Sequence, residues 1–267
     1  MADTITQLQP VPLKAKVFSR FVPRWVAPAV FIVLIALWQL CSSLGWVNPL
    51  ALASPYEVWQ QLHYLWQSGG LQEHVGASLR RLLLGWSLGS LLGVAVGLVI
   101  GLWIYARAGL LPLVSALFPV PKIALLPLFI VWFGTGEGSK IATILFGVFF
   151  PTVIATYAAI DGVDRGLIRM GQSFGLSTWA LIRKILLPGA LPGILAGFRI
   201  SFSIGITMLI AAEMIGAQNG IGTYILNAGA LFRLDQLLAG VVLLSLLGVL
   251  GAWLIGLVEK YALRWRE

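Results

Sequence analysis

Few residues in this chain have the types and spacing that catalysis or ligand chemistry requires. The segment 134–140, Gly-Thr-Gly-Glu-Gly-Ser-Lys, has the composition of a phosphate-binding loop. It departs from the G-x-x-x-x-G-K-[ST] pattern, because Ser139 stands where the second glycine belongs and Ile141 follows the lysine. We interpret the segment as a tight connector between two apolar stretches, and we assign no nucleotide site to it.

The residues that bind metals or form catalytic pairs are equally sparse. His63 and His74 have no carboxylate or cysteine neighbours at metal-ligand spacing, and we expect them to be surface residues. Cys41 is the single cysteine, which excludes an internal disulfide. No nucleophile–base arrangement emerges from the sequence. We therefore predict a protein that is not an enzyme, with no catalytic residue, no cofactor and no metal site of its own.

Composition places the chain in a membrane. Of its 267 residues 59% are hydrophobic and 10% charged, and the mean hydropathy is +0.92. Soluble domains carry about 25% charged residues, so one aqueous core cannot hide this apolar surface. The apolar runs are long and continuous, which excludes a porin-like barrel of alternating segments. The net charge of +8 comes from basic residues beside apolar runs, so it does not indicate a nucleic-acid partner.

Six stretches approach the roughly 20 apolar residues that cross a bilayer, which predicts an all-α polytopic membrane protein. They are residues 26–44, 82–104, 123–133, 141–160, 189–212 and 237–258. The third is short; it can extend backward through residues 110–118, with prolines that kink or break it. Residues 1–25 and 261–267 become tails around a membrane domain of residues 26–260, and the first span is read as a retained anchor.

Lysine and arginine counts orient these spans. With both termini in the cytoplasm, the basic residues predicted inside are Lys14, Lys16, Arg20, Arg24, Arg107, Lys122, Arg165, Arg169, Arg183, Lys184, Lys260, Arg264 and Arg266. Those predicted outside are Arg80, Arg81, Lys140 and Arg233. This bias places the polar segment 161–188 in the cytoplasm. The adjacent pair Arg80 and Arg81, on the predicted outer side, is the one local objection to this orientation.

The external connection of residues 46–78 contains a predicted amphipathic helix. Ser54 and Pro55 form a helix start, and Glu57, Val58, Gln61, Leu62, Leu65 and Trp66 follow at helical spacing. We expect an interfacial helix that serves packing rather than solute recognition.

The segment 161–188 has the pattern of a helical hairpin on the membrane surface. Apolar residues recur at helical spacing, and Gly175 interrupts them where glycine tolerates a turn. Asp161 and Asp164 precede the first helix, and Pro188 opens the next span. Such a hairpin exposes an apolar ridge to water unless a partner covers it, so it predicts a docking surface. The alternative is a plain cytoplasmic loop.

This segment resembles the coupling loop of ABC importer permeases, whose pattern is E-A-A, three residues, Gly, nine residues, Ile, one residue, Leu-Pro. Gly175, Ile185, Leu187 and Pro188 match it, whereas Arg169 stands at the expected glutamate, so a salt bridge from that acid cannot be carried over. The segments 119–128 and 132–134 resemble one branch, the permeases for nitrate, sulfonate, taurine, bicarbonate and related compounds. The resemblance covers about residues 79–258.

The resemblance implies the fold of a type I ABC importer permease in a bacterial inner membrane. It implies separate ATPase subunits that bind ATP and Mg, a second permease copy, a periplasmic or lipid-anchored binding protein, and ATP-driven alternating access. The implied ATPase-coupling residues are Arg169, Gly171, Ser173, Phe174, Gly175, Leu176, Trp179, Arg183, Ile185, Leu187 and Pro188. The expected solute is a small anion such as nitrate, a sulfonate or taurine. A stand-alone channel or secondary transporter is the alternative.

Polar residues within the spans give candidates for a translocation path or gate. They are Thr152, Thr156, Arg199, Ser203, Thr207 and Glu213. The hydroxyls can line a path or satisfy hydrogen bonds between helices. Arg199 can meet an anion, or lie near the cytoplasmic surface and bond to helix ends there. Glu213 is expected near the outer end, close to the gate or to the binding-protein contact.

Overall fold

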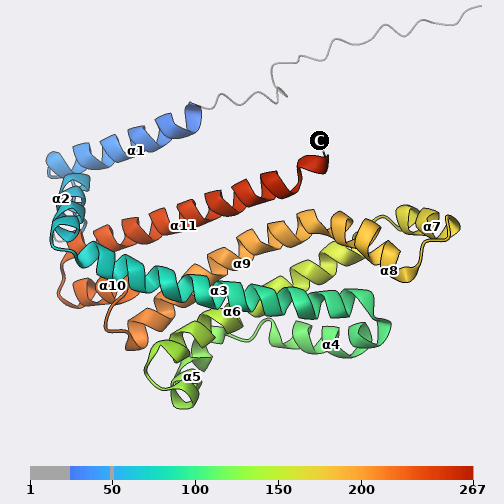
Figure 1. Cartoon of the computed structure of the whole chain (residues 1–267). Helices are drawn as coiled ribbons and strands as arrows, with labels where there is room; N and C mark the ends of the chain where they lie inside the picture. The colour runs from blue at the N-terminus through green and yellow to red at the C-terminus, as the bar shows by residue number, and fades with distance from the viewer. Residues whose placement is uncertain (1–24, 49–50, 267) are drawn as a thin grey trace, which may run out of the picture.

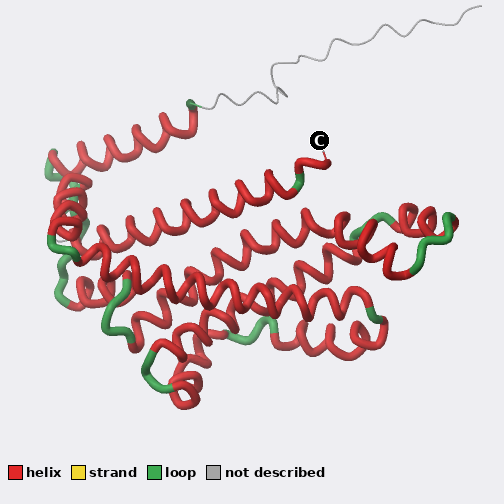
Figure 2. Tube along the Cα trace, viewed as in Figure 1, coloured by secondary structure: helices red, strands yellow, loops and turns green. Residues whose placement is uncertain are grey.

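The computed structural model describes residues 25–48 and 51–266; residues 1–24 of the predicted N-terminal tail and Glu267 lie outside this part. Within it every regular element is a helix (Figures 1 and 2). The first half contains α1 (Val26–Ser43), α2 (Pro55–Gln67), α3 (Gly70–Leu102), α4 (Ile104–Leu117), the 3₁₀ turn η1 (Lys122–Leu125) and α5 (Leu126–Phe133). The second half contains α6 (Glu137–Asp161), α7 (Arg165–Ser173), α8 (Thr178–Leu181), the π-turn η2 (Ile182–Leu186), α9 (Leu187–Gly216), α10 (Ile221–Ala230), α11 (Leu234–Ala262) and η3 (Arg264–Arg266).

The spans agree with the expected number when one of them is broken. Five described stretches are long and apolar enough to cross a membrane, namely α1, α3, α6, the run Thr178–Gly216 that contains α9, and α11. α4 and the η1–α5 pair pass the same test only together, and their axes differ by 88°. The predicted break in the third span is therefore confirmed, and counting the bent pair as one span gives six.

Three elements at one end of the bundle show which helices hydropathy predicts and which it misses (Figure 1). The predicted interfacial helix is α2, which Ser54 caps by accepting a hydrogen bond from the Glu57 amide at 3.2 Å. α3 begins at Gly70, well before the predicted start at residue 82, because its first turns are polar and extend beyond the apolar run. α10 was not predicted at all, since ten residues are too few to cross a bilayer.

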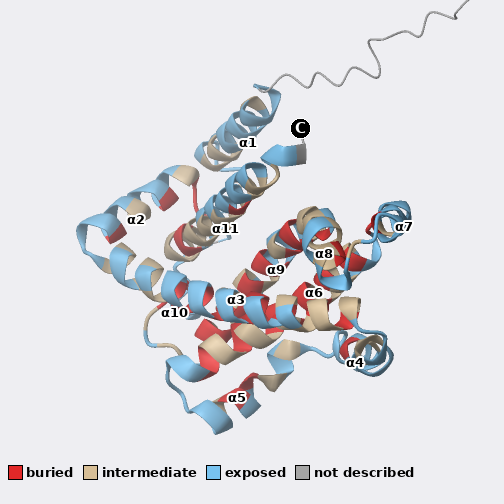
Figure 3. Cartoon of the chain, turned by 45° about the vertical axis from the view of Figure 1, so that its right-hand side comes forward, coloured by how far each residue is buried: buried red, intermediate tan, exposed pale blue. Residues whose placement is uncertain are grey.

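The core is a close three-helix contact of α3, α6 and α9 (Figure 3). Glycines recur every four residues on the face of α3 that meets α6, at Gly85, Gly89, Gly93, Gly97 and Gly101. Small residues let membrane helices approach closely, and dispersion contacts then hold them together. α1 and α11 are largely exposed in the single chain, and most of the buried residues lie in this central trio.

Enlarging one of these glycines should separate α3 from α6. A Cβ atom at Gly97 would lie 2.6 Å from Thr156 Cβ and 2.8 Å from the Val153 carbonyl oxygen. We expect Gly97→Val to cost about 1–3 kcal/mol, the usual range for overpacking. Thermal unfolding of the purified protein in detergent measures it. Gly76→Val on the same helix is the matched control, because no atom lies within 4 Å of that Cβ position; equal unfolding temperatures in both variants would contradict the close packing.

The structure changes the interpretation of three basic residues that were used to orient the spans. Lys122 was assigned to a cytoplasmic loop, but it lies inside the bent pair that forms the third span. Lys140 is buried and donates to the Thr135 and Gly136 carbonyl oxygens at 2.8 and 2.9 Å, which makes the 134–140 segment the tight connector that we expected. Arg81 is also buried, and it forms ion pairs with two carboxylates.

Candidate functional site

The segment 161–188 projects from one end of the helix bundle as a hairpin of α7 and α8 (Figure 1). Asp164 caps α7 by accepting a hydrogen bond from the Gly166 amide at 2.7 Å. Ser177 caps α8 in the same way, accepting from Ala180 at 3.3 Å. Gly175 has φ +72° and open space around it, so it is the turn between the two helices. A residue with a side chain is strained at this φ, which explains the glycine.

The inner side of the hairpin is closely packed. Gly171 is buried, and a Cβ atom there would lie 2.6 Å from Leu181 and 2.8 Å from Ile185. Leu176 would be 3.2 Å from the same position. The side chains of Leu181, Ile185 and Leu176 therefore converge on the backbone of α7, which fixes the angle between α7 and the following turns.

The outer side of the hairpin carries an apolar ridge that the single chain leaves uncovered. The exposed fractions are 46% for Leu167, 50% for Met170, 79% for Phe174 and 69% for Trp179. The basic residues Arg169, Arg183 and Lys184 are exposed around it, as is Ser173. Burial thus divides the predicted coupling residues into an outer group that can meet a partner and an inner group that holds the hairpin together.

The hairpin joins α9 through a wide turn. Residues Ile182–Leu186 form the π-turn, and Pro188 stands in the first turn of α9 directly after it. Proline removes one hydrogen bond of an α-helical ladder and clashes with the carbonyl four residues before it. A π-turn placed just before the proline relieves that clash, so Leu187 and Pro188 mark where the hairpin becomes a membrane span.

The predicted path residues do not form one cluster. Thr152 and Thr156 are fully buried on α6, and their side chains would meet Cβ atoms at Gly93 and Gly97 of α3. Thr152 donates to its own helix, at the Val148 carbonyl oxygen. Ser203 and Thr207 lie on the exposed side of α9 and bond to carbonyl oxygens one turn earlier. Arg199 donates to Glu259 of α11 at 2.6 Å, toward the C-terminal end of the chain.

Glu213 lies at the other end of α9 inside a polar network that the sequence did not reveal. Its side chain is fully buried and accepts from Arg81 at 2.8 Å and from the Ser78 hydroxyl at 2.7 Å. Arg81 also binds both carboxylate oxygens of Glu137 at 2.7 Å and the Asn219 carbonyl oxygen at 2.6 Å. These contacts join α3, α6 and α9 to the turn before α10, and they explain how Arg81 is accommodated on the side that the charge count assigned to the outside.

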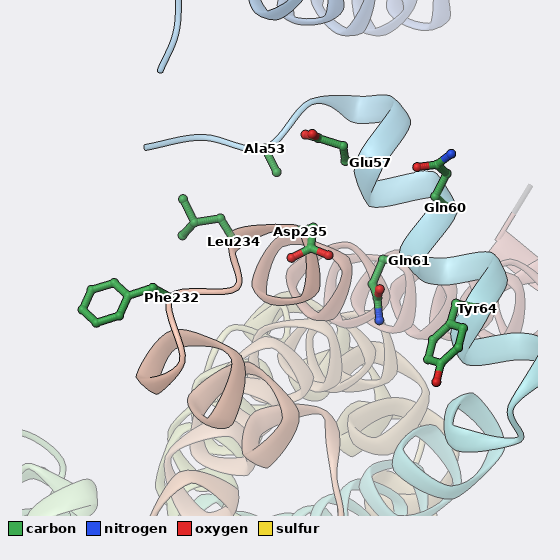
Figure 4. Close-up of a pocket in the computed structure, with 8 residues that line it drawn as sticks. All are labelled: Ala53, Glu57, Gln60, Gln61, Tyr64, Phe232, Leu234 and Asp235. Carbon is green, nitrogen blue, oxygen red and sulfur yellow. The ribbon is translucent and has the colours of Figure 1, made fainter. Parts of the chain in front are cut away.

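The same end of the molecule carries a cavity of about 440 Å³ between α2 and the turn from α10 to α11 (Figure 4). Its lining residues are Ala53, Glu57, Gln60, Gln61, Tyr64, Phe232, Leu234 and Asp235. Neither histidine lines it. His63 is exposed, and His74 accepts a hydrogen bond from the Gly220 amide at 3.2 Å while it packs against Tyr224. Among the described residues no group of His, Cys, Asp and Glu could hold a metal ion.

The arrangement defines a class of protein: a polytopic helical membrane protein with a small hairpin at one end of its bundle that exposes apolar side chains. The profile of the family described as "binding-protein-dependent transport system inner membrane component" matches residues 89–263. This match covers more than half of the chain. The chain therefore belongs to this family, and it is the permease subunit of an ABC importer.

Three relatives that match over most of this chain are named for the solutes that they transport. The chain is 38% identical to a putative aliphatic sulfonates transport permease, SsuC, of Escherichia coli K12 over 87% of this chain and 88% of that protein. It is 36% identical to SsuC of Bacillus subtilis 168, over 88% and 85%. It is 35% identical to the taurine transport system permease TauC of Escherichia coli K12, over 82% and 81%.

The fold has a solved counterpart. Chains from inward-facing structures of the MetNI methionine ABC transporter match with TM-scores of 0.61 and 0.63. They are 24% and 23% identical and cover 71% and 73% of this chain, and 94% and 97% of their own length. The likeness shows that the helix arrangement is that of an ABC importer permease, as the sequence predicted.

Proposed function

We propose that this permease carries a small aliphatic sulfonate, of the alkanesulfonate or taurine type, across the cytoplasmic membrane into the cell. The observation that carries the proposal is the identity of 35–38% to three permeases named for aliphatic sulfonates or taurine. In each case it extends over at least 81% of both chains.

The second part of the proposal is that the hairpin of α7 and α8 binds an ATPase subunit. Phe174 and Trp179 leave large aromatic faces in water on a segment whose inner side is rigidly packed. Aromatic side chains of this kind are typical anchors of protein interfaces. The partner would be an ATPase subunit that binds ATP and Mg, so that closure of two ATPase subunits moves the hairpin. This assignment places the hairpin and both chain termini in the cytoplasm.

Alternating access requires more than one chain. Ser203 and Thr207 lie on an exposed side of a membrane-spanning helix, where a second permease copy can cover them. A homodimer would place these two sides of α9 opposite each other around the solute path. Rearrangement of the hairpins would then open the pair alternately to the outside, where a substrate-binding protein delivers the solute, and to the cytoplasm.

The experiment that tests the function is stimulation of ATP hydrolysis by a delivered solute. The permease is co-expressed with its ATPase, reconstituted in liposomes, and mixed with its binding protein loaded from a panel of ethanesulfonate, taurine, nitrate, bicarbonate and methionine. We expect a stable complex and the largest stimulation with a sulfonate. A complex that responds to methionine or bicarbonate alone would overturn the solute class, whereas solute uptake by the permease without an ATPase would support a stand-alone transporter.

A further inference from the structure

Lys122 lies at the 88° bend between α4 and the η1–α5 pair. It begins η1 between α4 and α5, after Pro119 and Pro121, which cannot continue the hydrogen-bond ladder of α4. The bend leaves the last carbonyl groups of α4 without partners in their own helix. The Lys122 ammonium group donates to two of them, the carbonyl oxygens of Leu117, at 3.1 Å, and Phe118.

Two routes along the chain place this ammonium group near the middle of the apolar layer. The ring of Phe150 on α6 lies 5.0 Å from Nζ. Phe150 is roughly 16 Å of helix from the Asp161 end of α6 and roughly 20 Å from the Glu137 end. α4, which begins at Ile104 and ends shortly before Lys122, is about 21 Å long. An apolar layer is about 30 Å thick, so neither aqueous surface is near.

Lys122 also differs from the arginines of the spans in having no acidic partner. Arg81, Arg107 and Arg199 each form an ion pair with a carboxylate. Among the described residues no carboxylate lies within ion-pair distance of Lys122. Its partners are two carbonyl groups and the rings of Phe118 and Phe150, all of which carry only partial charges, so no full negative charge balances the ammonium group. Charges inside membranes are costly; they pair with other charges or with backbone carbonyl groups, and they mark the paths of solutes and ions.

The surroundings of this charge fit an anion with a short apolar body. The ammonium group has three N–H donors, and two of them bond to carbonyl groups. The neighbouring side chains Ile123 and Leu128 are exposed in the single chain, and the ring of Phe118 lies 5.2 Å from Nζ. η1 also contacts α6 and α9, the helices that carry the predicted path residues.

We propose that Lys122 is a solute-binding residue part way across the membrane: its ammonium group binds the sulfonate of the passing solute, while the apolar side chains beside it contact the alkyl part. This inference rests on the proposed function, since it assumes an anionic cargo. It explains why the residue at this bend is a lysine with one free N–H donor, since a neutral donor would be enough to cap the carbonyl groups.

The test replaces the charge and restores it chemically. In a Cys41→Ser background, Lys122→Cys is reconstituted with the ATPase and the binding protein, and uptake of radiolabelled ethanesulfonate is measured. We expect uptake to fall at least about tenfold, the loss typical of a charge-assisted hydrogen bond. 2-Aminoethyl methanethiosulfonate attaches an ammonium group, and its trimethylammonium analogue attaches the charge without N–H donors. Both should restore at least roughly a third of uptake, because attraction between opposite charges does not need the donors. The sulfonatoethyl reagent should restore none.

Several outcomes separate the alternatives. Restoration by the aminoethyl reagent alone means that the residue only caps α4, and that overturns the proposal; so does normal uptake by Lys122→Cys. Lys260→Cys, which is exposed at the end of α11, is the matched control and should be insensitive to all three reagents. Complex yield and basal ATP hydrolysis show that the variants are assembled. If the unmodified complex assembles but does not take up ethanesulfonate, the proposed function fails and this inference fails with it.

Discussion

Trp179→Asp should detach the permease from its ATPase while leaving the membrane domain folded. Trp179 is 69% exposed on the outer side of the hairpin, so the substitution removes little internal packing. It places a charge at the centre of an apolar surface that we expect a partner to bury. Central aromatic anchors of interfaces commonly contribute about 2 kcal/mol or more, so the complex should weaken at least about tenfold.

The measurement is the amount of ATPase that co-purifies with the tagged permease, together with ATP hydrolysis stimulated by the loaded binding protein. Phe174→Asp, at 79% exposure, should act in the same way. Gly175→Asp tests the turn between α7 and α8, where φ is +72°. Phe232→Asp is the matched control, an aromatic of 87% exposure on the opposite end of the molecule. Normal complex yield and transport in Trp179→Asp and Gly175→Asp would exclude the hairpin as the coupling element.

The spans were predictable because membrane insertion depends on local composition. A run of about 20 apolar residues crosses a bilayer whatever surrounds it, and α1, α6, α9 and α11 lie close to their predicted ranges. The hairpin was predictable for a similar reason, since helical spacing and Gly175 encode its turn locally. Which of its apolar residues point outward, such as Phe174, and which point inward, such as Leu181, depends on packing within the hairpin, where Leu181 meets Gly171 of α7.

The features that could not be predicted from the sequence depend on contacts between residues far apart in the chain. Arg81 and Glu213 are 132 positions apart, and neither has a partner nearby in the sequence that would announce the pair. Arg81 disagrees with the orientation that the count of basic residues predicts. Its burial beside the carboxylates of Glu137 and Glu213 accounts for this exception. α10 was missed because its ten residues are too few to cross a bilayer, and it packs on α9 and α11 instead. Lys122 was misplaced because the prolines predict a break but do not show that the segments on both sides of it belong to one span.

Arg81→Met should destabilise the end of the bundle that contains Glu213 more strongly than Gly97→Val destabilises its centre. It would leave the fully buried carboxylate of Glu213 without its cation, although Ser78 and the Gly222 amide still donate to it. Removing one member of a buried ion pair typically costs about 3–5 kcal/mol, because the remaining charge stays in an apolar surrounding. Thermal unfolding in detergent should show the loss as a lower midpoint temperature.

The effect should spread to α10, because the same network holds the turn before it. Arg81 donates to the Asn219 carbonyl oxygen, Ser78 accepts from the Ile221 amide at 2.8 Å, and Gly220 leaves no room beside the Glu213 carboxylate for a Cβ atom. Hydrogen exchange of residues 216–230 should therefore rise in Arg81→Met. Arg80→Met, on the exposed side of the same turn, should change neither measurement.

The double variant Arg81→Met/Glu213→Gln tests whether the penalty is the unpaired charge. It removes both charges, so it should lose less stability than the sum of the two single variants. A coupling of about 1 kcal/mol or more between the positions is expected for residues in one network. Strict additivity, with unchanged exchange of residues 216–230, would mean that Arg81 contributes only packing and that the turn before α10 is held by other contacts.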